Sequence, residues 1–316
     1  MPHRPLGRSG LSIAPLVLGG NVFGWTADEA TSFAVLDAFV AGGFNAIDTA
    51  DIYSKWVPGH AGGESETVIG AWLKARGGRD RVVIATKFGG PMAEDKKGLS
   101  KAWMVRAVEE SLRRLRTDYI DLYQAHFDDA DTPQDEVAEG FAALIKAGKV
   151  RAVGASNFSA ERLSSAIAAA RAAGVPRYES LQPQYNLYDR SSFEGPLQDL
   201  CVAEEIGVIP YYGLASGFLS GKYRSVDDLN KSPRGRGVAK YLDARGMRIL
   251  AALDQVSADL SASPAQVALA WILAQAGLTA PIASATSVEQ LGELMTGVRL
   301  VLSADQLAML DRASAA

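Results

Sequence analysis

Short apolar runs alternate with longer amphipathic segments along almost the whole chain. The runs that we expect to form strands lie at residues 16–18, 44–48, 82–86, 119–124, 150–154, 180–182, 208–211 and 280–283. Such nearly continuous apolar strands are typical of parallel sheets that are buried on both faces. Eight strand–helix units over this length predict an α/β fold, a closed (β/α)₈ TIM barrel, with residues 1–316 as one domain.

The amphipathic segments predict helices, and several have capping residues at their ends. We expect helices at 27–41 with Asp28 near its start, at 101–115 after Ser100, at 133–147 after Thr132 and at 160–173 after Ser159. Residues 4–13, with a turn at 8–10, predict a small β-hairpin before the repeat begins.

Three connections are longer than is usual between a strand and a helix, at 54–63, 88–99 and 212–245. All three follow predicted strands, so they belong to the C-terminal face of the barrel. Loops of this length are either functional or disordered. The last contains the cations Lys222, Arg224, Lys231, Arg234 and Arg236. This cationic segment is either a solvated surface or a set of contacts to an anion.

Composition excludes several classes of protein. Hydrophobic residues make up 48% of the chain and the net charge is −4, which indicates a globular core and no basic face for nucleic acid. The uncharged stretch 260–288 is interrupted by Pro264, Gly277 and Pro281, so we expect a helix and a strand there rather than a membrane span. Cys201 lies in an apolar helical pattern and is expected to pack in the core. No secretory signal begins the chain, and we expect a cytoplasmic protein.

Residues that can hold or transfer a proton follow three neighbouring runs. Asp48 ends the run at 44–48 with Tyr53 close behind, and Lys87 and His126 follow the next two runs. The carboxyl ends of parallel strands meet at one mouth, where such sheets build their active sites. Each residue alone is equally well explained as a core or surface residue. Together they predict a catalytic site.

Four motifs in this order resemble the aldo-keto reductase superfamily. They are D-T-A-D-I-Y at 48–53, A-T-K at 85–87, L-Y-Q-A-H at 122–126 and V-G-A-S-N-F at 153–158. The resemblance covers nearly the whole chain, and the long loops are similar to the bacterial branch related to potassium-channel β subunits. It implies NAD(P)H-dependent reduction of an aldehyde or ketone to an alcohol, with Tyr53 as the general acid.

Physical chemistry supports the same roles. The alkoxide that forms during carbonyl reduction must be protonated, and an ammonium about 4 Å from a phenol is worth roughly 4 kcal/mol, or three pKa units. We therefore expect Lys87 to lower the pKa of Tyr53 from about 10 toward about 7. Asp48 would keep Lys87 charged, and a neutral His126 would orient the carbonyl oxygen.

The resemblance also implies a cofactor site, with NADPH as the cofactor. The fingerprint G-x-G-x-x-G is absent after the first strand. The expected cofactor contacts are Gly20, Asn21, Asp48, Ser156, Asn157, Gln182, Tyr211, Tyr212, Gly213, Leu214, Ser216, Gly217, Lys222, Ser284, Gln290 and Glu293. Ser284 and Gln290 stand where the family commonly has basic residues for the 2′-phosphate, so we expect NADPH to bind more weakly than is typical and NADH to be used as well.

Aromatic residues just past the strand ends predict the substrate pocket, namely Phe23, Trp25, Trp56, Phe88 and Phe127. An aromatic mouth favours a neutral, bulky carbonyl compound as the small-molecule substrate. We expect no metal, because His3 and His60 lack companions at metal-ligand spacing, and no obligate protein partner. Two other functions stay open: a Schiff-base lyase that uses Lys87, and a nicotinamide-binding regulatory subunit with slow turnover.

Overall fold

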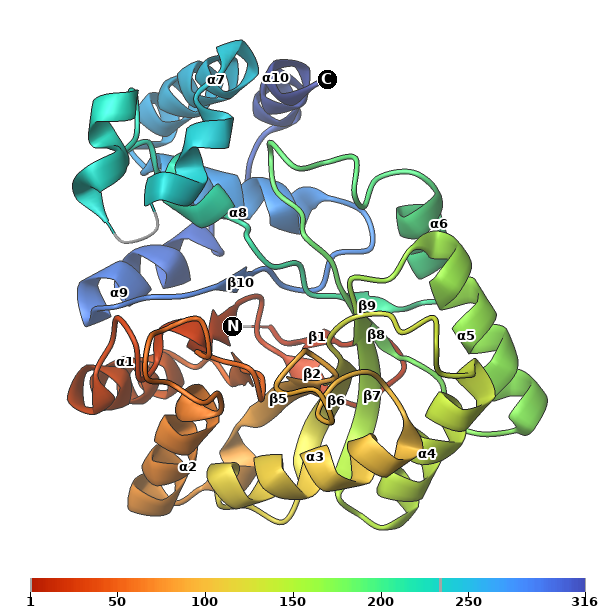
Figure 1. Ribbon diagram of the computed structural model, residues 1–316. Helices are drawn as coiled ribbons and strands as arrows, with labels where there is room; N and C mark the ends of the chain where they lie inside the picture. The colour runs from red at the N-terminus through yellow and green to blue at the C-terminus, as the bar shows by residue number, and fades with distance from the viewer. Residues whose placement is uncertain (1, 233–234, 316) are drawn as a thin grey trace.

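Eight parallel strands form a closed barrel in the computed structural model, which describes residues 2–232 and 235–315 (Figure 1). In sheet order they are β10 (Ile282–Ala283), β3 (Val17–Gly19), β4 (Ala46–Asp48), β5 (Val83–Phe88), β6 (Ile120–Ala125), β7 (Val150–Ser156), β8 (Ser180–Gln182) and β9 (Gly207–Val208). Backbone hydrogen bonds of 2.8 Å from Thr279 N to Val208 O and from Ile282 N to Pro210 O join the two ends of the sheet. The predicted (β/α)₈ barrel is thereby confirmed.

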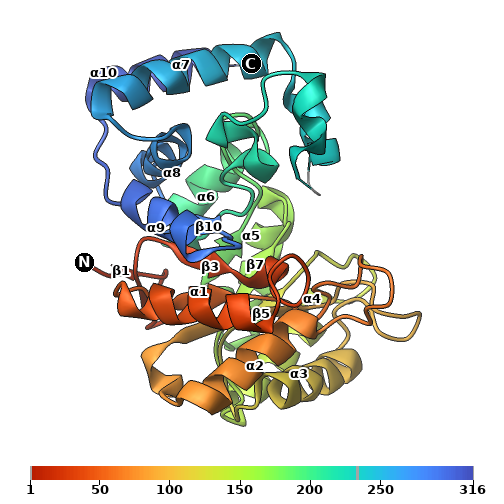
Figure 2. The same cartoon turned by 90° about the vertical axis from the view of Figure 1, so that its left-hand side faces the viewer.

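Helices surround this barrel on its outer side (Figures 1 and 2). They are α1 (Glu29–Ala41), α2 (Glu64–Arg76), α3 (Lys101–Leu115), α4 (Gln134–Lys146), α5 (Ala160–Ala173), α6 (Pro196–Ala203), α7 (Ala244–Leu260), α8 (Pro264–Ala274), α9 (Val288–Gly297) and α10 (Ala304–Ser314). The predicted caps Asp28, Ser100 and Ser159 each accept a backbone N–H of their helix. Thr132 is not a cap, because Pro133 holds that position and the Thr132 hydroxyl donates to Asp129 Oδ2 at 2.7 Å.

The predicted N-terminal hairpin is present as two antiparallel strands, β1 (Arg4–Pro5) and β2 (Ser12–Ile13). Leu6, Leu11 and Ile13 join the apolar cluster of the barrel interior, together with inward residues such as Leu122. Gly7, at φ +58°, lies so close to the backbone of Glu179 that a side chain there would clash. The hairpin therefore closes the N-terminal end of the barrel.

Alternation along the strands separates two cores. Leu122 and Gln124 point into the barrel, whereas Tyr123 between them packs in the larger cluster that lies between sheet and helices. The same alternation places Lys87 inside and Phe88 outside. Toward the C-terminal ends of the strands the interior thus changes from apolar to polar side chains.

The long connections gather on one side of the molecule, at the viewer's side in Figure 1 and at the right in Figure 2. The third contains the 3₁₀ helices η3 (Ala215–Ser220), η4 (Val226–Lys231) and η5 (Gly235–Tyr241), which the sequence pattern did not predict. Arg234 of the predicted cationic segment lies outside the described residues.

Two smaller predictions are confirmed outside the barrel mouth. The uncharged stretch folds as helix α8 followed by strand β10, and no helix in the described part of the chain is both long and apolar enough to cross a membrane. Cys201 is buried in α6, and burial raises the pKa of its thiol to about 12. A thiol with this pKa is protonated at neutral pH and packs as an apolar residue.

Candidate active site

Lys87 is the centre of the polar group at the strand ends. It is the next-to-last residue of β5, points into the barrel, and its side chain is fully buried. Its Nζ donates to Asp48 Oδ2 and to Thr49 O, both at 2.7 Å. A third hydrogen bond, of 3.2 Å, reaches Tyr53 Oη. All three N–H groups of the ammonium are therefore used, two to anchor the residue and one to hold the phenol.

Asp48 balances the charge of this lysine inside the barrel. Its Oδ1 accepts hydrogen bonds from Gln182 Nε2 at 2.8 Å and from Gln124 Nε2 at 3.2 Å, while Oδ2 takes the ammonium. Burial alone would lower the pKa of Lys87, but the attraction to Asp48, assisted by Tyr53, outweighs it and raises that pKa. A buried charge pair with its remaining lone pairs satisfied holds a fixed geometry. Lys87 is thus a charged donor.

Tyr53 is half-buried at the floor of the mouth, and its pKa differs from the prediction. Burial raises the pKa of Tyr53 above its ordinary value, and the opposing effect of Lys87 is the smaller of the two. Asp48 raises it further, because its negative charge offsets part of the ammonium's field. The expected fall toward 7 is therefore wrong for the free protein. The phenol stays protonated at neutral pH.

His126 faces the same phenol from the end of β6. The two ring centroids are 6.0 Å apart, and the imidazole is 8% exposed. Burial, and then the charge of Lys87, lower the pKa of His126 well below its ordinary value, so the ring is neutral as expected. Its Nδ1 is buried without a hydrogen-bond partner in the described residues. The structure thus brings the four predicted catalytic side chains together at one mouth.

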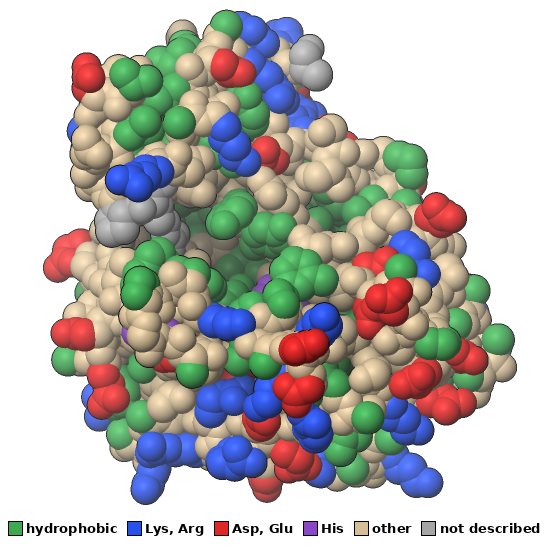
Figure 3. Space-filling model, in the orientation of Figure 1, with side chains coloured by type: hydrophobic (Ala, Val, Ile, Leu, Met, Phe, Trp, Pro, Cys, Tyr) green, Lys and Arg blue, Asp and Glu red, His purple; other side chains and the backbone are tan. Residues whose placement is uncertain are grey.

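Aromatic rings line this mouth. The Trp56 ring makes edge contacts with Trp25 at 5.6 Å and with Tyr53 at 5.7 Å, and Phe127 stacks on His126 at 4.5 Å. Trp56 and Phe127 are 49% and 43% exposed, so both present free surface to a ligand. In the space-filling view, hydrophobic side chains gather in a hollow that also contains histidine atoms (Figure 3).

Two of the predicted substrate contacts are in the core instead. Phe23 and Phe88 are fully buried, and Phe88 stacks on Tyr123 between the sheet and the helices. The reason for Phe88 is the pleat of the strand, since Lys87 points inward and its neighbour must point outward. Both phenylalanines therefore belong to the core and do not line the mouth.

Amide and hydroxyl groups form a second cluster beside the ion pair. Ser156 Oγ donates to Gln182 O at 2.8 Å, and Asn157 Nδ2 donates to His126 O at 2.9 Å. Asn157 Oδ1 accepts the phenol proton of Tyr211 at 2.7 Å. The four predicted contacts Ser156, Asn157, Gln182 and Tyr211 therefore lie side by side at one edge of the mouth.

The segment after β9 folds tightly over this edge. Tyr212, Ser216 and Gly217 have positive φ, at +57°, +58° and +97°. Gly213 and Leu214 lie between them, and the Gly217 N–H bonds to Leu214 O at 2.8 Å. Tyr212 is 47% exposed and contacts the ring of Tyr211 at 5.1 Å. The sequence motifs assigned Tyr212 to the cofactor, but its exposure also makes it a candidate wall of the mouth.

Two cations of the cationic segment are neutralised within the protein. Arg224 forms a two-pronged ion pair with Asp254, and Lys231 pairs with Asp228 at 2.7 Å. Lys222 is exposed, and its ammonium lies 5.2 Å from the centre of the Tyr223 ring. Of these cations, Lys222 is the best placed to meet an anion above η3.

The loop after β10 reaches the first strand. Ser284 Oγ donates to Asn21 Oδ1 at 2.6 Å, beside Gly20. Gln290 Oε1 is already occupied by Thr286, which donates both its N–H and its hydroxyl at 3.0 Å. Glu293 follows one turn later on α9. Thr286 and the α9 cap Ser287 lie in the loop 284–293 that was expected to face the adenosine, but neither was named as a contact, although the spacing of Ser287 and Gln290 is that of a helix cap.

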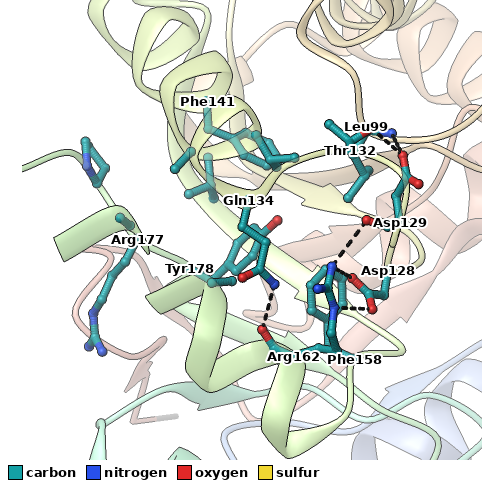
Figure 4. A pocket seen from close by; sticks show the side chains of 16 residues that line it. Leu99, Asp128, Asp129, Thr132, Gln134, Phe141, Phe158, Arg162, Arg177 and Tyr178 are labelled. Atoms are coloured by element: carbon teal, nitrogen blue, oxygen red, sulfur yellow. Dashed lines mark hydrogen bonds and ion pairs between the residues drawn. The ribbon is translucent and has the colours of Figure 1, made fainter. Parts of the chain in front are cut away.

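A separate cavity lies between α4 and α5, on the outer side of the barrel (Figure 4). It is lined by Phe141, Tyr178 and Arg162, and Arg162 pairs with Asp128 at 2.7 Å. Its volume of about 20 Å³ is far below the roughly 300 Å³ that organic ligands need.

In the described residues, no group of three or more His, Cys, Asp or Glu side chains is placed to hold a metal.

Known proteins are similar in sequence to this chain over nearly its whole length. The model of the aldo/keto reductase family matches residues 15–315. The chain is 36% identical to the uncharacterized oxidoreductase YrpG of Bacillus subtilis, covering 98% of this chain and 95% of that protein. It is 31% identical to the norsolorinic acid reductase of Aspergillus flavus and 30% identical to the aryl-alcohol dehydrogenase [NADP(+)] of Phanerodontia chrysosporium, in each case over 98% of this chain and over 80% and 85% of the relatives. The chain therefore belongs to the aldo/keto reductase family and is an NAD(P)H-dependent oxidoreductase.

Proposed function

We propose that this protein reduces a bulky aldehyde or ketone to an alcohol, with Tyr53 as the general acid. The observation that carries the proposal is the chain of contacts from Asp48 through Lys87 to Tyr53, with hydrogen bonds of 2.7 Å and 3.2 Å. A protonated phenol at the floor of an aromatic mouth is positioned to give its proton to a substrate oxygen.

The direction of the Lys87–Tyr53 hydrogen bond supports this role. The ammonium is the donor, so the phenol oxygen is the acceptor and its own proton is free for another acceptor. As the proton leaves, negative charge grows on an oxygen that already contacts an ammonium. His126 is neutral and adjacent, so it would orient the same substrate oxygen. Together these groups bind and protonate the developing alkoxide.

The amide cluster fits a nicotinamide carboxamide. Ser156, Asn157 and Gln182 offer both donors and acceptors at one edge of the mouth, and Tyr211 presents an aromatic ring beside them. When bound there, the reduced nicotinamide supplies the hydride that the protein itself lacks. Lys222 and the backbone of η3 would hold the pyrophosphate, and Gly20, Asn21, Ser284 and Glu293 the adenosine end.

The residues expected around the adenosine offer no positively charged group for the 2′-phosphate of NADPH. Ser284, Thr286 and Ser287 are uncharged, and Gln290 is engaged with Thr286. A 2′-phosphate is normally held by a cation or a two-pronged donor. NADPH stays the first choice because a relative carries NADP(+) in its name, and we propose that NADH is also used.

The aromatic walls favour a flat, apolar substrate. Trp25, Trp56 and Phe127 present ring faces and edges, which bind planar aromatic groups through stacking and burial. The names of two relatives, an aryl-alcohol dehydrogenase and a norsolorinic acid reductase, agree with an aromatic carbonyl compound.

The alternatives receive less support from the same geometry. A Schiff-base lyase needs a neutral amine as nucleophile, whereas all three donors of Lys87 are bonded and its pKa is raised. A regulatory subunit with slow turnover would need no acid poised in the mouth, yet Tyr53 is held there.

A panel of aromatic and aliphatic aldehydes and ketones tests the proposal. Oxidation of NADPH and of NADH is followed by absorbance with the purified protein. We expect turnover with aromatic carbonyl compounds and little with short aliphatic ones. Cofactor binding without turnover on any carbonyl compound would favour the regulatory function, and a substrate trapped on Lys87 by borohydride would favour the lyase.

A further inference from the structure

Glu64 organises the loop between β4 and α2 through backbone hydrogen bonds. It is the first residue of α2, and its carboxylate accepts the N–H of Ser54 at 3.1 Å and of Ala61 at 2.8 Å. The N–H of Gly62 points at both oxygens, at 3.2 and 3.1 Å. One side chain therefore ties the beginning of the loop 54–63 to its end.

The same turn of α2 holds the backbone of Tyr53. The carbonyl of Tyr53 accepts the N–H of Gly63 at 2.8 Å and that of Ser65 at 3.4 Å. The N–H of the same peptide group, which belongs to Ser54, donates to the Glu64 carboxylate. The peptide group that follows Tyr53 is thus fixed at both its C=O and its N–H to the beginning of α2.

Glu64 also contacts the loop that carries the other tryptophan of the mouth. A side-chain carbon added to Gly24, at φ +71°, would lie 3.2 Å from Glu64 Cβ, so the two backbones pack closely there. Trp25 follows Gly24, and its ring meets Trp56 of the loop 54–63 at 5.6 Å. Glu64 therefore packs against the residue that precedes Trp25.

Neighbouring groups complete the support of this loop. The ring of His60 bonds to Ser54 Oγ through Nδ1 at 2.9 Å and lies 3.9 Å from Glu64 Oε2. Lys55 Nζ donates to Pro91 O and Met92 O of the next long loop. Glu64 is the member of this set that accepts most of the backbone donors.

We propose that Glu64 is a positioning residue, which fixes Tyr53 and the Trp25–Trp56 wall so that the mouth is formed before substrate binds. The inference rests on the proposed carbonyl reduction at this site. It adds a specificity-determining role for a residue that does not touch the substrate. Preformed walls lower the ordering cost of binding a large ligand.

The chemistry requires a carboxylate at this position. Three backbone donors converge on two oxygens, and a carboxylate accepts at both. Glutamine has the same shape, but one oxygen is replaced by an NH₂ group that would face N–H donors. Glu64→Gln therefore removes the acceptor with almost no change of volume.

The matched control is Glu29→Gln. Glu29 is also the first residue of a 13-residue helix, α1, and it is exposed. The two substitutions change the charge at a helix N-terminus equally. Of the two glutamates, only Glu64 accepts hydrogen bonds from loop N–H groups in the described part of the chain.

Hydrogen-exchange mass spectrometry of the full-length protein measures the loop directly, and steady-state kinetics measure its effect. In Glu64→Gln we expect amide exchange in peptides that cover 54–63 to rise about tenfold, the factor for one lost charge-assisted hydrogen bond. The KM for an aromatic aldehyde should rise by about the same factor, while the Kd for NADPH stays within about twofold. Glu29→Gln should change neither quantity.

The results separate this inference from the proposed function. Unchanged loop exchange in Glu64→Gln, or faster exchange with the aldehyde KM unchanged, would overturn it. If the wild-type protein reduces no carbonyl compound, the proposed function fails, although the exchange result still reports whether Glu64 holds the loop. If Glu64→Gln does not fold, Glu64→Asp keeps the charge but shortens the reach, and the same two readouts decide.

Discussion

Lys87 donates a 3.2 Å hydrogen bond to the phenol oxygen of Tyr53, and that ammonium is itself held by Asp48 at 2.7 Å. The arrangement holds a protonated phenol rather than a phenolate, because burial and Asp48 together outweigh the lysine's effect on the pKa of Tyr53. The ammonium therefore acts mainly when negative charge develops on the phenol oxygen, as it does during proton transfer.

The pH dependence of kcat/KM for reduction should be flat over the neutral range. This ratio reports the ionisation of the free enzyme. The pKa of Tyr53 is raised above about 10 and that of His126 is well below about 6.5, so neither group changes charge between about pH 6.5 and pH 9.5. An initial-rate profile with an aromatic aldehyde checks this. A fall in rate with an inflection near pH 7 would show a phenol of lowered pKa.

Removal of the lysine charge should cost both activity and stability. In Lys87→Met the carboxylate of Asp48 is left buried without its cation, so we expect the free energy of unfolding to fall by about 3–5 kcal/mol. We also expect a loss of about 10²–10³-fold in kcat, because no ammonium stabilises the developing phenolate.

The double variant Asp48→Asn/Lys87→Met separates the two effects. With both charges removed, stability measured by urea unfolding should recover in part, while activity should not. Recovery of reduction in the double variant would show that the ion pair is structural only.

Asp51 should make the protein less stable as the pH rises. Both oxygens of its buried carboxyl group lack hydrogen-bond partners in the described residues, and burial, followed by the charge of Glu66, raises its pKa well above the ordinary value. Above about pH 4 the unfolded chain is ionised at this position while the folded chain keeps the proton, so stability falls until the raised pKa is reached.

The substitution Asp51→Asn removes that ionisation. We expect the free energy of unfolding of Asp51→Asn, relative to that of the wild type, to be about 1–3 kcal/mol larger at pH 8 than at pH 5. Thermal or urea unfolding at both pH values measures the change, with the exposed Asp305→Asn as control. A difference between Asp51→Asn and the wild type that does not vary with pH would contradict the account.

A cation at the start of α9 should strengthen binding of the 2′-phosphate. Gln290 is exposed in the first turn of this helix, and Gln290→Arg would add a two-pronged donor there. We expect KM for NADPH to fall about tenfold relative to KM for NADH, a difference of one charge-assisted contact. Val301→Arg, at an 87% exposed position beyond the other end of α9, controls for net charge. An equal change in both variants would place the phosphate elsewhere.

Strand ends were the part of the site that the sequence pattern predicted best. Asp48, Lys87 and His126 each follow an apolar run, and parallel strands must bring such residues to one mouth. Phe88 was misplaced because the prediction used its distance from the strand end and ignored the pleat, which turns it away from Lys87.

Other features of the site depend on how deeply a side chain is buried and on its contacts with the backbone. Neither can be derived from the residue types alone. The direction of the pKa shift of Tyr53 is decided by how far burial outweighs one nearby ammonium, and burial depth follows only from the packed structure. Glu64 was missed because its partners are backbone N–H groups of a loop. A glutamate at a helix start is otherwise explained by the helix dipole alone.

The most direct test of the central claim is Tyr53→Phe, measured for turnover and for cofactor binding. Steady reduction of an aromatic aldehyde is followed by NADPH absorbance, and the Kd for NADPH by fluorescence titration. Without the phenol proton we expect kcat to fall by at least about 10³-fold, with the Kd within about twofold of the wild type. Turnover at the wild-type rate in Tyr53→Phe would contradict the assignment of Tyr53 as the acid.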